Sequence, residues 1–262
     1  MHLLTVVNKH HVGLDLWKKS AERVGLKPTI LWAPPTSKIG HESKWFGQKF
    51  VTLDKHLSTL PEDDLCLVTD GFDVAFVGDP EEDIRKFNAP LLFAAEKFEN
   101  PDQGLPYTGN HTFKYLNSGV YAGSAGEIRR ALKPALQSSN VLALDDQRYF
   151  TQYYFNSGRI VLDHEAKVFA CLAGTEFFKG PKVLHFQGFY KETKPLCDIP
   201  ELCALAMKLR RVPNFMTPVW DAIKHLGGLV VPQYEFPFGL ALVLLIIIVI
   251  YDVIKTNRYA GT

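Results

Sequence analysis

The sequence predicts an α/β fold in which helices flank a mostly parallel sheet. The first observation is that residues 3–69 alternate short apolar runs with segments of helical spacing, in the order strand–helix–strand–helix–strand. Such an order builds a parallel sheet with right-handed crossovers, as in nucleotide-binding α/β domains. The second observation is that Cys66–Val68 is continuously apolar, which is typical of a strand buried on both faces.

Each element is predicted from apolar spacing and from the residues that interrupt it. Apolar residues at helical spacing and Gly25 near the end indicate a helix over Leu14–Leu26, and a second helix is expected over Gln48–Leu60. The expected strands are Leu3–Val7, Thr29–Trp32, Leu65–Thr69, Pro90–Ala95, Leu116–Ala122, Ile160–Leu162, Val168–Ala170 and Val183–Leu184. The remaining expected helices are Ala125–Leu136, Asp145–Tyr154, Ala204–Arg211 and Val219–Leu226.

Composition indicates one globular domain, which we place at residues 1–230. Hydrophobic residues make up 47% of the 262 residues and charged residues 22%. The net charge of +1 and the lack of a long basic run exclude nucleic acid as an expected partner. The four cysteines form no C-x-x-C pair, so a zinc knuckle is not expected and we interpret all four as non-catalytic.

The C-terminal region contains a candidate membrane anchor, predicted over residues 236–254. Phe236–Tyr251 carries no charge, and its sixteen residues would span roughly 24 Å as a helix, slightly less than a ~30 Å hydrocarbon core. A buried helix of a globular domain has the same pattern. The position of this segment, the last in the chain and followed by Lys255 and Arg258, favours a single-pass anchor.

The side of the membrane that faces the domain stays open. Basic residues flank the apolar segment on both sides, so they do not decide the orientation. No signal peptide is predicted at Met1–Val7, and its absence favours a cytosolic face. The glycosylation pattern Asn110-His111-Thr112 and a possible bridge between Cys197 and Cys203 would fit a lumenal face.

Two carboxylates follow the third expected strand. Gly71 interrupts the chain after Thr69, so Asp70 and Asp73 lie at the carboxyl end of the strand, where open α/β sheets bind their ligands. Two carboxylates on one turn can share a hard divalent cation, and such a cation can hold a diphosphate. A surface turn in which the aspartates only cap the chain is the alternative.

A later segment offers a third ligand. His185 follows an apolar pair in KVLHFQGFYKETK, at the end of an expected strand. Gly188 allows a ligand to approach the backbone closely, and Lys191 offers a charge for a phosphate. The alternative is a strand edge followed by a solvated lysine loop.

Further polar residues have two interpretations each. Asp145 and Asp146 open a helix, where acidic residues usually cap the N-terminus, but one of them could position an acceptor hydroxyl or act as a base. Asn117 could hold a sugar hydroxyl or lie in a turn. Lys49 could reach a phosphate or be solvated.

The motifs TDGFDV, FAAE, YLNSGVYAG, DDQRYFTQ and LHFQGFYK occur in this order along the chain. With them the chain resembles, from about Leu3 to Lys194, the glycosyltransferase domain of the procollagen lysyl hydroxylases and more distantly the collagen galactosyltransferases. The resemblance implies a GT-A fold that transfers a hexose from a UDP-sugar with Mn²⁺. It also implies that Asp70, Asp73 and His185 hold the metal, and an imidazole ligand favours manganese over magnesium.

The resemblance assigns roles to the other motif residues as well. It implies that Phe72 stacks on uridine and that Thr5, Val6 and Val7 line the nucleoside pocket. It also implies that Lys49 and Lys191 lie near the diphosphate, and that Asn117, Asp145 and Asp146 lie near the donor sugar and the acceptor. Two departures are Asn100, where the family has tryptophan, and the lone Leu144, where it has a longer acidic run. Both lie on the acceptor side.

The expected function is therefore a Mn²⁺-dependent transfer of a hexose to a hydroxyl of a glycan, glycoprotein or collagen-like acceptor. UDP-glucose is the favoured donor and UDP-galactose is possible. The alternatives are a catalytically idle, membrane-tethered protein that binds a sugar nucleotide or glycan, and a UDP-sugar hydrolase or nucleotidyltransferase. Retention and inversion of the anomeric centre both stay open.

Overall fold

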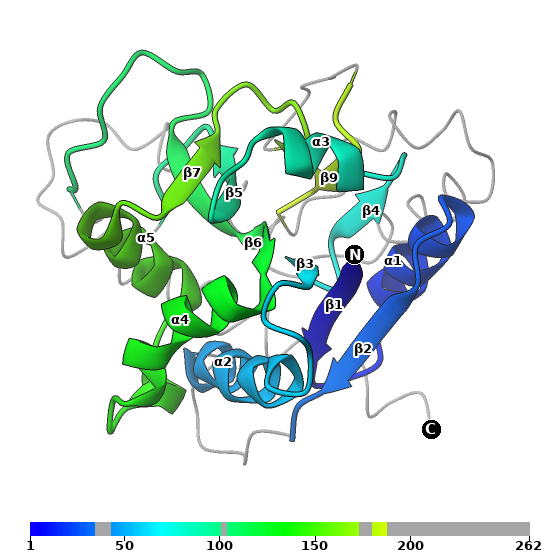
Figure 1. Ribbon diagram of the computed structural model, residues 1–262, viewed down its shortest axis with the longest axis horizontal. Helices are drawn as coiled ribbons and strands as arrows, with labels where there is room; N and C mark the ends of the chain where they lie inside the picture. The colour runs from blue at the N-terminus through cyan, green and yellow to red at the C-terminus, as the bar shows by residue number, and fades with distance from the viewer. Residues whose placement is uncertain (35–42, 101–103, 173–179, 188–262) are drawn as a thin grey trace, which may run out of the picture. The chain divides into compact units, whose positions relative to one another are not determined.

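The computed structural model describes residues 1–34, 43–100, 104–172 and 180–187 (Figure 1). All of them belong to the first of the two units into which the chain divides, Met1–Arg211. The strands are β1 (His2–Val7), β2 (Pro28–Trp32), β3 (Leu65–Thr69), β4 (Val74–Phe76), β5 (Leu91–Glu96), β6 (Tyr115–Ser124), β7 (Ile160–Asp163), β8 (Phe169–Cys171) and β9 (Val183–His185). The helices are α1 (Val12–Arg23), α2 (Ser43–Leu57), α3 (Glu81–Lys86), α4 (Ala125–Leu136), the 3₁₀ helix η1 (Val141–Ala143) and α5 (Asp146–Ser157).

The larger sheet has the strand order β2-β1-β3-β6-β5-β7. Strand β1 pairs in parallel with β2 and β3, and β5 pairs in parallel with β7. Strand β6 runs antiparallel to both of its neighbours, β3 and β5. The prediction of a mostly parallel sheet is thus confirmed, with β6 as the reversed strand.

The side chains of β1 divide the core between the two faces of this sheet. Leu4 and Val6 pack on one face, in the cluster that contains apolar residues of α2, α4 and α5. Leu3 and Val7 pack on the other face, in the cluster that contains apolar residues of α1 and of the smaller sheet. This alternation is the period of two expected of a strand buried on both sides.

A register shift in β6 shapes the end of the sheet. Phe93 of β5 pairs with Tyr121, whereas the next residue, Ala94, pairs with Asn117, so residues 118–120 of β6 bulge out of the ladder with β5. On the other side of β6, Val120 still pairs with Thr69, the last residue of β3. The bulge therefore lies beside the carboxyl end of β3.

The smaller sheet brings together segments that lie far apart in the sequence. Its order is β4-β9-β8, and Val74 of β4 pairs with His185 of β9. The backbone N–H of Phe186 also donates to the carbonyl of Asp73 at 2.8 Å. His185 is consequently held beside the turn that follows β3.

Some expected elements differ from the observed ones. Helix α2 begins at Ser43 and not at Gln48, and β4 was not predicted as a strand. Helix α3 was not predicted because its six residues are too few to show a helical period. The expected helices Ala204–Arg211 and Val219–Leu226, and the expected anchor at 236–254, lie outside the described residues. Within the described ranges, no helix is long and apolar enough to cross a membrane.

Candidate active site

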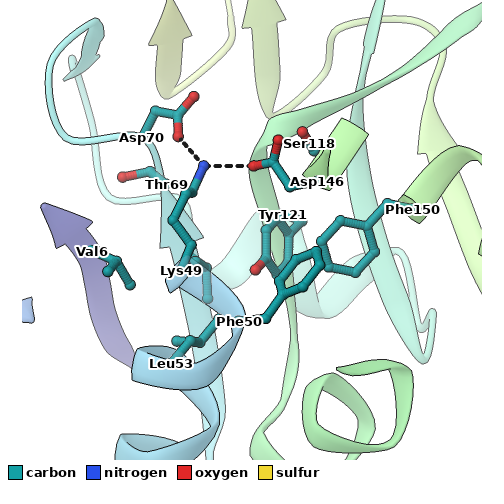
Figure 2. A pocket seen from close by; sticks show the side chains of 11 residues that line it. Val6, Lys49, Phe50, Leu53, Thr69, Asp70, Ser118, Tyr121, Asp146 and Phe150 are labelled. Carbon is teal, nitrogen blue, oxygen red and sulfur yellow. Dashed lines mark hydrogen bonds and ion pairs between the residues drawn. The ribbon is translucent and has the colours of Figure 1, made fainter. Parts of the chain in front are cut away.

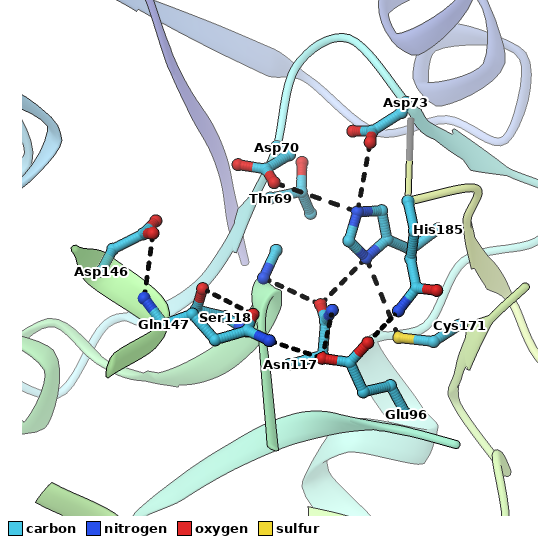
Figure 3. Close-up of polar contacts among 12 residues, drawn as sticks. Thr69, Asp70, Asp73, Glu96, Asn117, Ser118, Asp146, Gln147, Cys171 and His185 are labelled. Atoms are coloured by element: carbon cyan, nitrogen blue, oxygen red, sulfur yellow. Dashed lines mark hydrogen bonds and ion pairs between the residues drawn. The ribbon is translucent and has the colours of Figure 1, made fainter. Parts of the chain in front are cut away.

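The carboxylates of Asp70 and Asp73 and the imidazole of His185 meet at the carboxyl end of β3 (Figure 3). The Nε2 atom of His185 lies 3.4 Å from Oδ2 of Asp73 and 3.9 Å from Oδ2 of Asp70. One potential ligand atom from each residue lies within 4.8 Å of the other two. Two carboxylate oxygens and one imidazole nitrogen at this spacing fit a single divalent cation.

His185 is buried, and its surroundings set both its orientation and its charge. The Nδ1 atom lies 2.9 Å from Oδ1 of Asn117 and 3.8 Å from the thiol of Cys171. Burial by itself would lower the pKa of His185, but the facing carboxylate of Asp73 outweighs burial and raises the pKa well above its usual range. A cation that binds at Nε2 must therefore displace a proton.

The backbone of Gly119 closes the site from the side of β6. A Cβ atom at this position would lie 2.3 Å from Cε1 of His185 and 2.9 Å from Oδ2 of Asp70. The carbonyl of Gly119 accepts a hydrogen bond from the N–H of Asp70 at 2.7 Å. Only glycine leaves room for the imidazole and the carboxylate at this point.

Beside these three residues lies a pocket with Lys49 at its centre (Figure 2). The Nζ atom donates to Oδ1 of Asp70 at 2.8 Å and to Oδ2 of Asp146 at 2.6 Å. Burial would lower the pKa of Lys49, but the charges of these two carboxylates outweigh burial and raise the pKa above its ordinary value. Lys49 is therefore a cation that joins a candidate metal ligand to Asp146. The rings of Phe50, Tyr121 and Phe150 pack against one another in the wall of the pocket.

The two aspartates that open α5 have separate positions. Asp145 is the N-cap, and its Oδ1 accepts from the backbone N–H of Arg148 at 2.8 Å. Asp146 is buried, and it faces Lys49 in the pocket. Of the two interpretations given for this acidic pair, capping therefore describes Asp145, whereas Asp146 points into the site.

The residues expected near the nucleoside lie around the same strand end. Val6 lines the pocket, whereas the side chains of Thr5 and Val7 lie beneath Gly71 on the opposite face of β1. The ring of Phe72 is half-buried and lies 4.9 Å from the ring of His11, centroid to centroid. Gly188 and Lys191 lie outside the described residues.

The sequence prediction missed part of the polar network. Glu96, at the end of β5, accepts hydrogen bonds from Asn117, Gln147 and Gln187. Gln147 in turn accepts from the backbone N–H and the hydroxyl of Ser118 at 3.1 and 3.2 Å. A charged residue that closes an otherwise apolar strand, as in LLFAAE, was the available signal for Glu96.

The comparison with known families decides the relationship. The model of the PLOD GT domain matches residues 1–186 of this chain. The chain belongs to this family. The matched range contains every candidate residue named above except Gln187, Gly188 and Lys191.

Curated proteins with procollagen-lysine hydroxylase names are similar to this chain. The human protein named procollagen-lysine,2-oxoglutarate 5-dioxygenase 2 is 37% identical over 189 residues, which cover 66% of this chain and 25% of that protein. The rat multifunctional procollagen lysine hydroxylase and glycosyltransferase LH3 is 31% identical over 147 residues, 52% of this chain and 19% of that protein. The chain thus spans about a quarter or less of the length of these relatives.

Solved structures show the fold. The galactosyltransferase LgtC, crystallised with donor and acceptor sugar analogues, superposes with a TM-score of 0.51 at 14% identity, and the match covers 83% of this chain and 99% of that one. The chain is therefore a PLOD-type glycosyltransferase domain with the mixed α/β architecture of the GT-A enzymes.

Proposed function

We propose that this PLOD-type domain transfers a hexose from a UDP-sugar to a hydroxyl group, with Mn²⁺ bound by Asp70, Asp73 and His185. UDP-glucose is the favoured donor, UDP-galactose is the second, and the acceptor is a glycan, a glycoprotein or a collagen-like chain. The observation that carries the proposal is the meeting of these three side chains at the carboxyl end of β3, with potential ligand atoms within 4.8 Å of one another.

The arrangement suits the cleavage of a sugar–diphosphate bond. Negative charge grows on the departing UDP, and a bound divalent cation supplies a positive charge next to it. Lys49 adds a second cation within hydrogen-bond distance of Asp70. In the same proposal Phe72 stacks on uridine, and the backbone end of β1 at Thr5, Val6 and Val7 lines the nucleoside pocket.

Asp146 is the residue that we propose to face the acceptor. Its carboxylate is buried, and burial raises the pKa of Asp146, while the ammonium group of Lys49, 2.6 Å away, opposes this shift. The carboxylate form can accept a proton from a hydroxyl or orient it. Asp145 holds α5 in place as its N-cap, so that Asp146 projects into the pocket.

The test follows the release of UDP by the full-length chain. The protein is incubated with UDP-glucose or UDP-galactose, with Mn²⁺ or with EDTA, with and without glycan acceptors. We expect release that requires Mn²⁺, that an acceptor accelerates, and that Asp73→Asn lowers by 100-fold or more, roughly the effect of losing a residue that stabilises the transition state. Asp15→Asn, an exposed carboxylate in the first turn of α1, is the matched control and should keep the wild-type rate.

The outcomes separate the possible functions. Folded protein that binds a UDP-sugar and releases no UDP would contradict the proposal and favour an idle binding protein. Release that no acceptor accelerates would favour a hydrolase. Nuclear magnetic resonance of the product anomer then distinguishes retention from inversion.

We further propose that residues 236–254 anchor the domain to a membrane as a single-pass helix. The support is that Phe236–Tyr251 carries no charge and that Asp252 is the one charged residue of the segment. Membrane flotation of the full chain, compared with a variant that ends at Glu235, tests this proposal, because only the full chain should float with the lipid.

A further inference from the structure

Glu96 is a buried carboxylate that binds three side-chain amides, each from a different segment of the chain. Its side chain closes β5, and the residue is 4% exposed. Oε1 accepts from Nδ2 of Asn117 at 3.3 Å and from Nε2 of Gln147 at 2.5 Å, while Oε2 accepts from Nε2 of Gln187. Since these amides come from β6, from α5 and from the residues after β9, Glu96 connects both sides of the site (Figure 3).

Asn117 links Glu96 to the candidate metal ligand His185. Its Nδ2 points at Glu96, so its Oδ1 points away from it. The backbone N–H of Gly119 donates to that oxygen at 2.9 Å, which independently identifies it as the amide oxygen. The same oxygen lies 2.9 Å from Nδ1 of His185.

The order of donors and acceptors determines which nitrogen of His185 can bind a cation. An amide oxygen only accepts, so Nδ1 of His185 must carry the hydrogen in this contact. Once a cation has displaced the second proton, the lone pair is on Nε2, which faces Asp73 and Asp70 at 3.4 and 3.9 Å. A hydrogen bond at the second ring nitrogen commonly orients a metal-binding histidine.

We propose that Glu96 and Asn117 are positioning residues that hold His185 with Nε2 directed at the divalent cation. The chain of contacts is carboxylate, amide, imidazole and cation. This inference rests on the proposed metal site, and it goes further because it explains a buried acid that has no contact with the ligand atoms.

The experiment measures binding of Mn²⁺ alone, by titration calorimetry on the full-length protein without any sugar nucleotide. Glu96→Gln has the same shape but replaces one carboxylate oxygen with an N–H donor and removes the negative charge, so three amides compete for one acceptor oxygen and the hold on Asn117 weakens. We expect the dissociation constant for Mn²⁺ to rise about 10- to 100-fold. Glu62→Gln, an exposed glutamate ahead of β3, is the matched control and should bind Mn²⁺ like the wild type.

A swap of the two groups makes the test specific for orientation. Asn117→Asp alone places two carboxylates against each other and should also weaken binding. In the double variant Glu96→Gln/Asn117→Asp, the new amide donates to the new carboxylate, which can still accept from Nδ1 of His185. We therefore expect the double variant to bind Mn²⁺ more tightly than either single variant. A purely structural role would instead give losses that add.

A second readout reports the hydrogen on the ring. In ¹⁵N-histidine spectra of the Zn²⁺-loaded protein, used as a diamagnetic substitute, His185 should carry its hydrogen on Nδ1. Wild-type protein that binds no Mn²⁺ would refute the metal site itself. Wild-type binding that Glu96→Gln and Asn117→Asp leave unchanged would overturn the positioning role while the metal site stands. If Glu96→Gln does not fold, Asn117→Ser, which removes the linking amide, takes its place with the same expected weakening.

Discussion

Gly119→Ala should damage the site by adding a single methyl group. The new Cβ would lie 2.3 Å from Cε1 and 2.8 Å from Nε2 of His185, and 2.9 Å from Oδ2 of Asp70. Ordinary contact begins near 3.4 Å, so the imidazole or the β6 backbone must move by about 1 Å, a displacement that can cost about 100-fold in rate. Overpacking of a filled core also costs about 1–3 kcal/mol of stability. The variant should therefore fold, with a lower melting temperature.

The assay compares UDP release over a range of Mn²⁺ concentrations with thermal unfolding of the same protein. We expect the Mn²⁺ concentration for half-maximal activity to rise and the maximal rate to fall. Gly126→Ala, in the first turn of α4, is the control, because the nearest atom to its Cβ would be Cβ of Glu62 at 3.2 Å, far from the site. A folded Gly119→Ala protein with wild-type activation by Mn²⁺ would refute the close approach on which the reasoning depends.

Two further predictions concern charge. Lys49→Met leaves the buried carboxylate of Asp146 without its partner, so the free energy of unfolding in urea should fall by about 3–5 kcal/mol. The control Lys18→Met removes an exposed ion pair and should change the free energy of unfolding by less than about 1 kcal/mol. Equal effects of the two substitutions would contradict the burial of Lys49. Because the pKa of His185 is raised in the metal-free protein, Mn²⁺ must displace a proton, and its affinity should rise with pH by up to about tenfold per pH unit until the pH passes that pKa. Calorimetry in two buffers of different ionisation enthalpy should detect the released proton, and a pH-independent affinity would exclude this displacement.

The short-range pattern of the sequence was sufficient for most elements of the fold. Strands β1, β3 and β5 appeared as apolar runs, and α4 coincides with its predicted bounds. The reversed direction of β6 could not be predicted, because a strand that is apolar on both faces has the same pattern whichever way it runs. Helix α3 was missed because its six residues are too few to show a helical period.

The sequence likewise predicted part of the candidate site and left part of it undecided. Asp70, Asp73 and His185 could be singled out from the sequence because each follows a strand, and the motif resemblance linked them. The sequence could not separate Asp145 from Asp146, since an acidic pair at a helix start suits a cap and an active site equally well. The direction in which α5 enters the domain separates them. The carboxylate of Asp145 accepts from the backbone N–H of Arg148 in α5, whereas the carboxylate of Asp146 accepts from Lys49.

The sequence by itself determined the class of fold, the family and the residues at the strand ends, since these depend on local composition and on motifs in order. Only the tertiary structure decided that Glu96 and Asn117 lie behind His185. Their contacts depend on the pairing of β4 with β9 and on a register shift in β6, and register depends on how distant strands pack, which no local pattern contains.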